Sequence, residues 1–198
     1  MDKLTLEKEL VQRGYKYVCG VDEVGRGPLA GPVVCAAVIM PLDDVIEGVD
    51  DSKKLSAKKR EMLAEKIKEK AIAYAICRVE AQTIDQINIL EATKLCMKQA
   101  VESLSVPADF VLVDGNMTLD LSVDQQYVIK GDANSYSIGS ASIIAKVFRD
   151  DIMKEYAKEY PHYAFEKNAG YGTAVHIKGI EEHGLCPIHR RSFTKKWQ

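Results

Sequence analysis

Apolar and polar positions follow two periods along the chain, which predicts a domain built from both strands and helices. Two nearly continuous apolar runs, 17–19 and 33–39, flank a glycine-rich turn and predict two buried strands in a hairpin-like unit. Further short apolar runs predict strands at 72–79, 110–114 and 127–130. Helical patterns lie between these runs, so the sequence indicates an α/β domain with a mixed sheet.

Apolar positions at helical spacing predict the segments that cover this sheet. Ser56 has the side chain of a helix N-cap, and Met62, Leu63 and Ile67 behind it form one apolar face. The predicted helices are 2–13, 57–70, a helix from Thr83 or Asp85 to about 104, a helix from Ser137 or Ser140 that ends before Pro161, and 174–182.

Composition limits the class of protein. Apolar residues make up 46% of the 198 residues, and no apolar run approaches the roughly 20 residues of a membrane span. The five cysteines are scattered and the N-terminus lacks the apolar core of a signal peptide, so we expect a soluble cytoplasmic protein with reduced thiols. The net charge of −2 does not by itself indicate a nucleic-acid binder, although an acidic cluster can offset a basic groove.

Acidic residues stand where three of the apolar runs end, at Asp22 with Glu23, at Asp114 and at Asp132. If these strand ends converge, the carboxylates need a cation, and oxygen ligands suit Mg²⁺ or Mn²⁺. Two such ions would activate a water and stabilise the leaving oxygen of a phosphodiester. Adjacent side chains on a strand point to opposite faces, so Asp22 and Glu23 share a site only if the strand ends or bends there.

Two other interpretations of the polar residues are open at this stage. Each acid, taken alone, has the ordinary role of a turn residue, and Asp150 with Asp151 is expected to be surface charge. A zinc site on His176, His183, His189 and Cys186 fits no standard ligand spacing.

Six sequence blocks in order resemble the bacterial ribonuclease HII family, the type 2 ribonucleases H. The blocks are GVDEVGRGPLAGP at 20–32, DSKKL at 51–55, VDG at 113–115, KGD at 130–132, SASIIAKVFRD at 140–150 and GYGT at 170–173. The resemblance implies an RNase H-like mixed sheet flanked by helices, with a C-terminal helical region. We therefore divide the chain into an N-terminal helical extension (1–14), a catalytic core (15–160) and a C-terminal substrate-binding region (161–198).

The resemblance also implies an activity. Members of this family cut the RNA strand of RNA/DNA hybrids and cut 5′ of single ribonucleotides in duplex DNA, leaving 5′-phosphate and 3′-hydroxyl ends. The four carboxylates that the family uses to bind two Mg²⁺ or Mn²⁺ ions correspond to Asp22, Glu23, Asp114 and Asp132. We expect a monomer, and we leave open a replication partner on the C-terminal tail.

The resemblance also implies which residues contact the substrate. The family's junction-sensing loop corresponds to Gly25-Arg26-Gly27, its tyrosine to Tyr171, and two phosphate-contacting lysines to Lys53 and Lys146. Glycines let backbone N–H and C=O groups approach a 2′-OH closely, Arg26 suits the neighbouring phosphate, and Tyr171 suits stacking on a sugar or base.

Two positions depart from the family pattern, and both concern substrate preference rather than chemistry. Ala169 stands where a basic residue is usual, and Gly139 precedes the SAS block where alanine is common. The basic stretch with Arg190, Arg191, Lys195 and Lys196 is interpreted either as a phosphate-tracking patch or as a solvated tail.

Two competing functions have weaker support. A nucleotide-binding ATPase with 25–31 as its phosphate loop lacks the GK[ST] sequence, and the acids before the loop would repel phosphate. A non-catalytic hybrid-binding module is disfavoured because all four acids are present.

Overall fold

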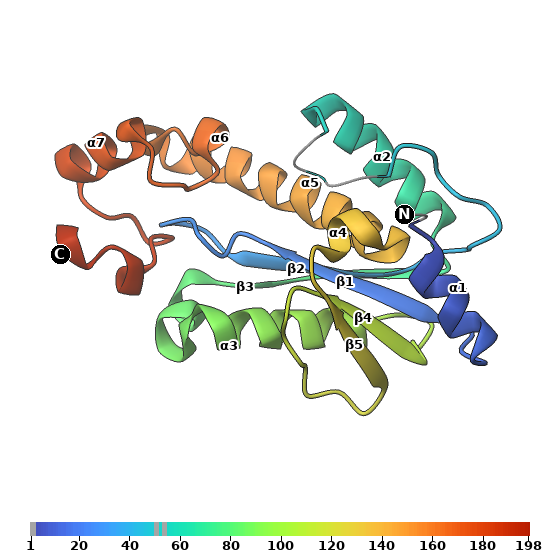
Figure 1. Ribbon diagram of the computed structural model, residues 1–198. Helices are drawn as coiled ribbons and strands as arrows, with labels where there is room; N and C mark the ends of the chain where they lie inside the picture. Colours follow the sequence, from blue (N-terminus) through green and yellow to red (C-terminus); the bar gives the residue numbers. More distant parts are fainter. Residues whose placement is uncertain (1–2, 50–51, 53–54) are drawn as a thin grey trace.

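A mixed sheet with strand order β3-β2-β1-β4-β5 organises the fold (Figure 1). The computed structural model describes residues 3–49, 52 and 55–198, and the statements below concern that part of the chain. The strands are β1 (Val18–Val24), β2 (Val33–Ile39), β3 (Ala73–Val79), β4 (Phe110–Asp114) and β5 (Asp124–Val128).

Helices lie on both faces of this sheet. The α-helices are α1 (Thr5–Gln12), α2 (Ala57–Lys70), α3 (Ala81–Glu102), α4 (Gly131–Asn134), α5 (Tyr136–Glu159), α6 (Phe165–Asn168) and α7 (Ala174–His183), with short 3-10 turns η2 (Pro161–Tyr163), η3 (Arg191–Phe193) and η4 (Lys195–Trp197). Helix α3 covers one face, and α5 with α2 covers the other (Figure 1).

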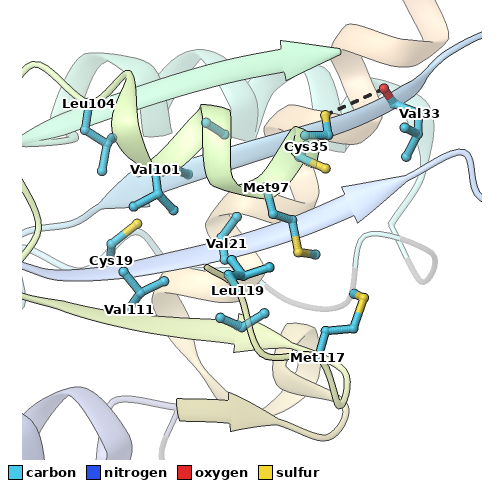
Figure 2. Close-up of a cluster of buried hydrophobic side chains, with 14 of the residues drawn as sticks. Cys19, Val21, Val33, Cys35, Met97, Val101, Leu104, Val111, Met117 and Leu119 are labelled. Carbon is cyan, nitrogen blue, oxygen red and sulfur yellow. Dashed lines mark hydrogen bonds between the residues drawn. The ribbon is translucent and has the colours of Figure 1, made fainter. Parts of the chain in front are cut away.

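Each face of the sheet has its own apolar core, because the two long central strands are buried on both sides. On one face, Met97 and Val101 of α3 pack over Val21 of β1 and Val111 of β4 (Figure 2). On the opposite face, α2 and α5 pack against the alternate residues of β2. The central strands therefore lie between two layers of helices.

Strand pairing changes direction in the middle of the sheet. β1 runs antiparallel to β2 and parallel to β4, and β4 runs parallel to β5. The hairpin-like unit of the first two strands and the mixed sheet are confirmed. The division of the chain into three regions stays a prediction, although Leu10 of α1 is buried against Val18 and Phe110 of the core.

Several predicted elements match the structure closely. The helix at 57–70 is observed with those bounds, and the Ser56 side chain accepts the N–H of Lys59 as an N-cap. The predicted strands at 33–39 and 110–114 also have the observed bounds.

Several boundaries were predicted wrongly; for example, the helix predicted at 2–13 is observed at Thr5–Gln12. α3 begins at Ala81, before Thr83 and Asp85, and it is kinked at Asn88, whose side chain accepts the N–H groups of two following residues. β5 covers Asp124–Val128 rather than 127–130. The prediction missed its start because this edge strand is largely exposed to solvent and carries polar residues instead of an apolar run.

The start of α5 was also predicted wrongly. Ser135, and neither Ser137 nor Ser140, caps the helix by accepting the N–H of Ile138. Ser137 and Ser140 are buried within the helix. In the described residues no helix is both long and apolar enough to cross a membrane.

Candidate active site

The parallel pairing of β1 with β4 brings the first two acids together. Val21 is the register partner of Val113, so Asp22 and Asp114 follow at neighbouring positions at the carboxyl ends of adjacent strands. The carboxyl ends of parallel strands are where α/β sheets commonly form sites.

Glu23 lies near Asp22 and Asp114 because the edge of β1 that faces β4 is unpaired beyond Val21. Pairing with β4 ends at Val21, whereas pairing with β2 continues to Val24, so the strand does not end at the acids as expected from the sequence. The Glu23 N–H donates to Oδ1 of Asp22 over 2.7 Å. As a result, carboxylate oxygens of Asp22, Glu23 and Asp114 all lie within 4.8 Å of one another.

The fourth predicted acid belongs to the same cavity but not to this close group. Asp132 lies in the short helix α4 and lines a cavity of about 300 Å³ together with Asp22, Glu23 and Asp114. Oδ1 of Asp114 accepts the N–H groups of Gly131 over 2.7 Å and Asp132 over 3.4 Å, which ties α4 to the end of β4.

Burial makes this cluster unfavourable for negative charge. Burial raises the pKa of Asp22 well above its usual range, and the charges of Glu23 and Asp114 raise it further. Burial also raises the pKa of Glu23, although the Arg26 guanidinium opposes this shift. The pKa of Asp114 is raised by burial and then by Asp132.

The cluster fits a hard divalent cation. Oε2 of Glu23 is buried and accepts no hydrogen bond in the described part of the chain, although a buried carboxylate oxygen normally has a partner. Among the described residues, Arg26 is the cation that pairs with the cluster; it reaches the other oxygen of Glu23 at 3.5 Å and is itself about half exposed. An oxygen-only site with an unpaired buried oxygen is a suitable environment for Mg²⁺ or Mn²⁺.

One wall of the cavity contains side chains that the sequence did not single out. The hydroxyls of Ser52 and Ser142, both buried, hydrogen-bond over 3.0 Å beside Asp22. Both serines belong to the quoted sequence blocks, which was the available signal. Lys146 also lines the cavity and is paired with Asp150.

Asp150, expected to be surface charge, is partly buried and paired with two cations. Its carboxylate is mostly buried between Lys146 and Arg60, with Arg60 Nη2 at 3.7 Å. An i, i+4 pair on α5 brings Asp150 under Lys146. Asp150 therefore holds the ammonium group of Lys146 at the rim of the cavity.

The glycine-rich loop lies against the loop that carries Tyr171. Gly25 has a φ of +94°, a conformation that glycine adopts readily. A side-chain carbon added at Gly27 would lie 3.5 Å from Cε1 of Tyr171, and Leu29 N–H donates to Gly170 O over 2.8 Å. Tyr171 remains about half exposed and lines the cavity.

The remaining predicted residues are placed differently. Lys53 lies outside the described residues. The alternative zinc site has no support. Nε2 of His176 and Nε2 of His189 hydrogen-bond to each other over 3.0 Å. Within the described residues, the side chains that are grouped closely enough to hold a metal ion are those of the carboxylate trio. Arg190, interpreted as part of a basic patch or solvated tail, is instead completely buried.

Comparisons with known proteins agree with this geometry. The family model of ribonuclease HII matches residues 19–196. Ribonuclease HII of Caldicellulosiruptor saccharolyticus is 55% identical over 190 residues, covering 96% of this chain and 93% of that protein. Ribonuclease HII of Ligilactobacillus salivarius is 54% identical over 192 residues, covering 97% of this chain and 75% of that protein.

A solved structure has the same fold. The ribonuclease H2 of Pyrococcus horikoshii superposes with a TM-score of 0.78 at 27% sequence identity, covering 92% of this chain and 97% of that one. The mixed sheet with carboxylates at the ends of its parallel strands thus defines a ribonuclease of the RNase H fold class. Within that class the chain belongs to the ribonuclease HII family, whose members cleave RNA in RNA/DNA hybrids.

Proposed function

We propose that this protein is an endonuclease that uses two divalent ions to cut 5′ of single ribonucleotides in duplex DNA, as well as within the RNA strand of hybrids. The observation that carries the proposal is the trio of Asp22, which is buried, with the half-buried Glu23 and Asp114, whose ligand oxygens lie within 4.8 Å of one another. Such a cluster is unfavourable without a cation, and the unpartnered Oε2 of Glu23 supplies a ligand.

Asp22, Glu23, Asp114 and Asp132 would hold Mg²⁺ or Mn²⁺. When bound, these ions supply Lewis-acid stabilisation and a more acidic water. The net reaction adds the water oxygen to phosphorus and breaks the bond from phosphorus to O3′. The water loses one proton and O3′ gains one, which leaves a 5′-phosphate on the ribonucleotide and a 3′-hydroxyl on the preceding nucleotide.

The residues around the cavity would bind and orient the substrate. The glycine loop Gly25-Arg26-Gly27 approaches the 2′-OH through its backbone, and Arg26 is exposed for a phosphate. Tyr171 stands beside Gly27 at the cavity with its ring exposed for stacking on the sugar or base that follows. Lys146 lies at the same rim to contact a phosphate, and Lys53 has the same proposed role.

The same proposal covers the oligomeric state and the binding partners of the protein. We propose that the protein acts as a monomer on RNA/DNA hybrids and on ribonucleotide-containing duplex DNA. The exposed lysines Lys195 and Lys196 near the C-terminus are available to a replication partner or to a phosphate backbone.

The test offers the protein two end-labelled duplexes, with Mg²⁺, with Mn²⁺ and with chelator. One duplex contains a single ribonucleotide in DNA, and the other is all DNA. We expect metal-dependent cutting of the first duplex alone, at the phosphodiester 5′ of the ribonucleotide. Cutting on the 3′ side, cutting of the all-DNA duplex, or cutting in chelator would each refute the proposal.

A further inference from the structure

Two arginines that lie beneath the glycine loop have no role in the site described so far. Arg149 of α5 and Arg190 of the C-terminal region are both fully buried. Neither pairs with a carboxylate within 4.0 Å in the described part of the chain, although buried charges are normally paired. Their positive charges are instead satisfied by the backbone.

Arg190 binds the start and the end of the loop at once. Its Nη2 donates to Gly25 O, its Nη1 donates to Arg26 O over 2.8 Å, and its Nε donates to Gly31 O over 3.0 Å. The Phe193 ring packs against this guanidinium, with 5.2 Å between the ring centroid and Cζ. The planar fork of arginine suits three acceptors held at fixed directions.

Arg149 joins the loop to its neighbour. Its Nε donates to Pro32 O over 2.9 Å, its Nη2 to Ala30 O over 3.2 Å, and its Nη1 to Ala169 O over 2.9 Å. Ala169 immediately precedes the segment with Tyr171. Arg149 therefore fixes the spacing between the glycine loop and the tyrosine loop.

These contacts determine which way the loop peptides face. In a planar trans peptide, C=O and N–H point in opposite directions. Because Gly25 O and Arg26 O point inward to Arg190, the N–H groups of Arg26 and Gly27 point outward. Neither N–H donates a hydrogen bond within the described residues. The C=O of Gly25, expected to be available to the 2′-OH, therefore already accepts a hydrogen bond from Arg190.

We propose that Arg149 and Arg190 are positioning residues that orient the outward N–H groups of the glycine loop and so determine the preference for a ribonucleotide. The inference rests on the proposed function, in which this loop contacts the 2′-OH. Neither arginine touches the substrate, because both are buried. Their effect on substrate therefore passes through the peptides of Gly25 and Arg26.

The test measures affinity without cleavage. The dissociation constants of the single-ribonucleotide duplex and of the matched all-DNA duplex are measured in Ca²⁺ for the wild type, Arg190→Lys and Arg149→Lys. Lysine keeps the charge but lacks the fork, so it cannot hold the same carbonyls. Arg78→Lys on β3, whose side chain pairs with Glu80 at 2.8 Å on the surface, is the matched control.

We expect Arg190→Lys to reduce the preference for the ribonucleotide duplex at least five-fold, with less than two-fold change for all-DNA. Arg149→Lys should give a smaller reduction, because Arg190 still donates to the carbonyls of Gly25 and Arg26 in that variant. The control should match the wild type. An unchanged preference, or equal weakening for both duplexes, would overturn the proposal, since the latter indicates a merely structural role.

Two further readouts keep the outcomes distinct. If the wild type itself shows no preference and no metal-dependent cutting, the proposed function fails rather than this inference. If a variant does not fold, the proposal is tested on the wild type by following the amide NMR signals of Arg26 and Gly27 as each duplex is added. They should shift more with the ribonucleotide duplex than with all-DNA, and equal shifts would contradict the proposal.

Discussion

Replacing Asp22 by asparagine should make the metal-free protein more stable while removing its response to divalent ions. Asparagine keeps an oxygen that can accept the Glu23 N–H but removes one of three clustered charges. At an effective dielectric constant of about 20, two unit charges 4.8 Å apart repel by about 3 kcal/mol. Because burial raises the pKa of these acids, not all of them are charged at neutral pH, and we expect a net gain of about 1–3 kcal/mol.

The sign of the pH dependence follows from the direction of the shift. The folded-state pKa of Asp22 lies above its ordinary value of 3.8, so its contribution to stability is present below that value and is lost as pH rises through the raised pKa. The stability difference between Asp22→Asn and the wild type should therefore grow with pH in chelator.

Thermal and urea unfolding, in chelator and in Mn²⁺, measure this effect. A gain of about 2 kcal/mol corresponds to a Tm higher by roughly 4–8 °C for a domain of this size. The wild type should gain about 2.7 kcal/mol with free Mn²⁺ at 100 times Kd, and Asp22→Asn much less. The exposed Asp43→Asn is the control. A variant that is less stable than wild type in chelator at pH 8, or that gains as much from Mn²⁺, would refute this reasoning.

Two further predictions concern stability. Gly20→Ala should cost about 3 kcal/mol or prevent folding, because its Cβ would lie 2.2 Å from the backbone carbon of Ser137, and urea unfolding measures the loss. His189→Gln should flatten the acid sensitivity of the protein. Burial and the neighbouring His176 lower the pKa of His189 to about 4. The neutral ring therefore stabilises the folded state, and this contribution is complete above the unfolded-state pKa of 6.5. The contribution should fall by about 2 kcal/mol between pH 7 and pH 5. Urea unfolding of both proteins at these pH values should show the wild type losing more; equal losses would exclude His189 as the cause.

The parts of the fold that were predictable from sequence are those that local patterns specify. The helix at 57–70 combines an N-cap at Ser56 with a regular apolar face, and both signals are local. The strand at 33–39 is buried on both faces, so its continuous apolar run is unambiguous. Asp22 and Asp114 were identifiable because each stands near the end of such a run.

The features that sequence did not predict depend on distant partners. The capping potential of Asp85 is used elsewhere, since its carboxylate accepts the N–H groups of Arg191 and Ser192 from the C-terminal region. Arg149 and Arg190 are charged residues that local patterns assign to the surface. Their burial depends on loop carbonyls more than 115 residues away in sequence.

The proximity of Glu23 to Asp22 likewise has a non-local cause. Side chains alternate along a strand, so the sequence alone suggested that β1 must end or bend at these acids. In the structure β1 continues, and the early end of its pairing with β4 opens the edge where both carboxylates meet.

The most direct test of the account compares the wild type with Asp114→Asn on the single-ribonucleotide duplex. Cutting is measured in Mn²⁺, and binding is measured in parallel in Ca²⁺. We predict that the variant loses cutting by at least about 10³-fold, since it loses a proposed metal ligand of the carboxylate trio. Its affinity for the duplex should stay close to that of the wild type. An Asp114→Asn protein that still cuts at a rate near that of the wild type would contradict the carboxylate site as the centre of catalysis.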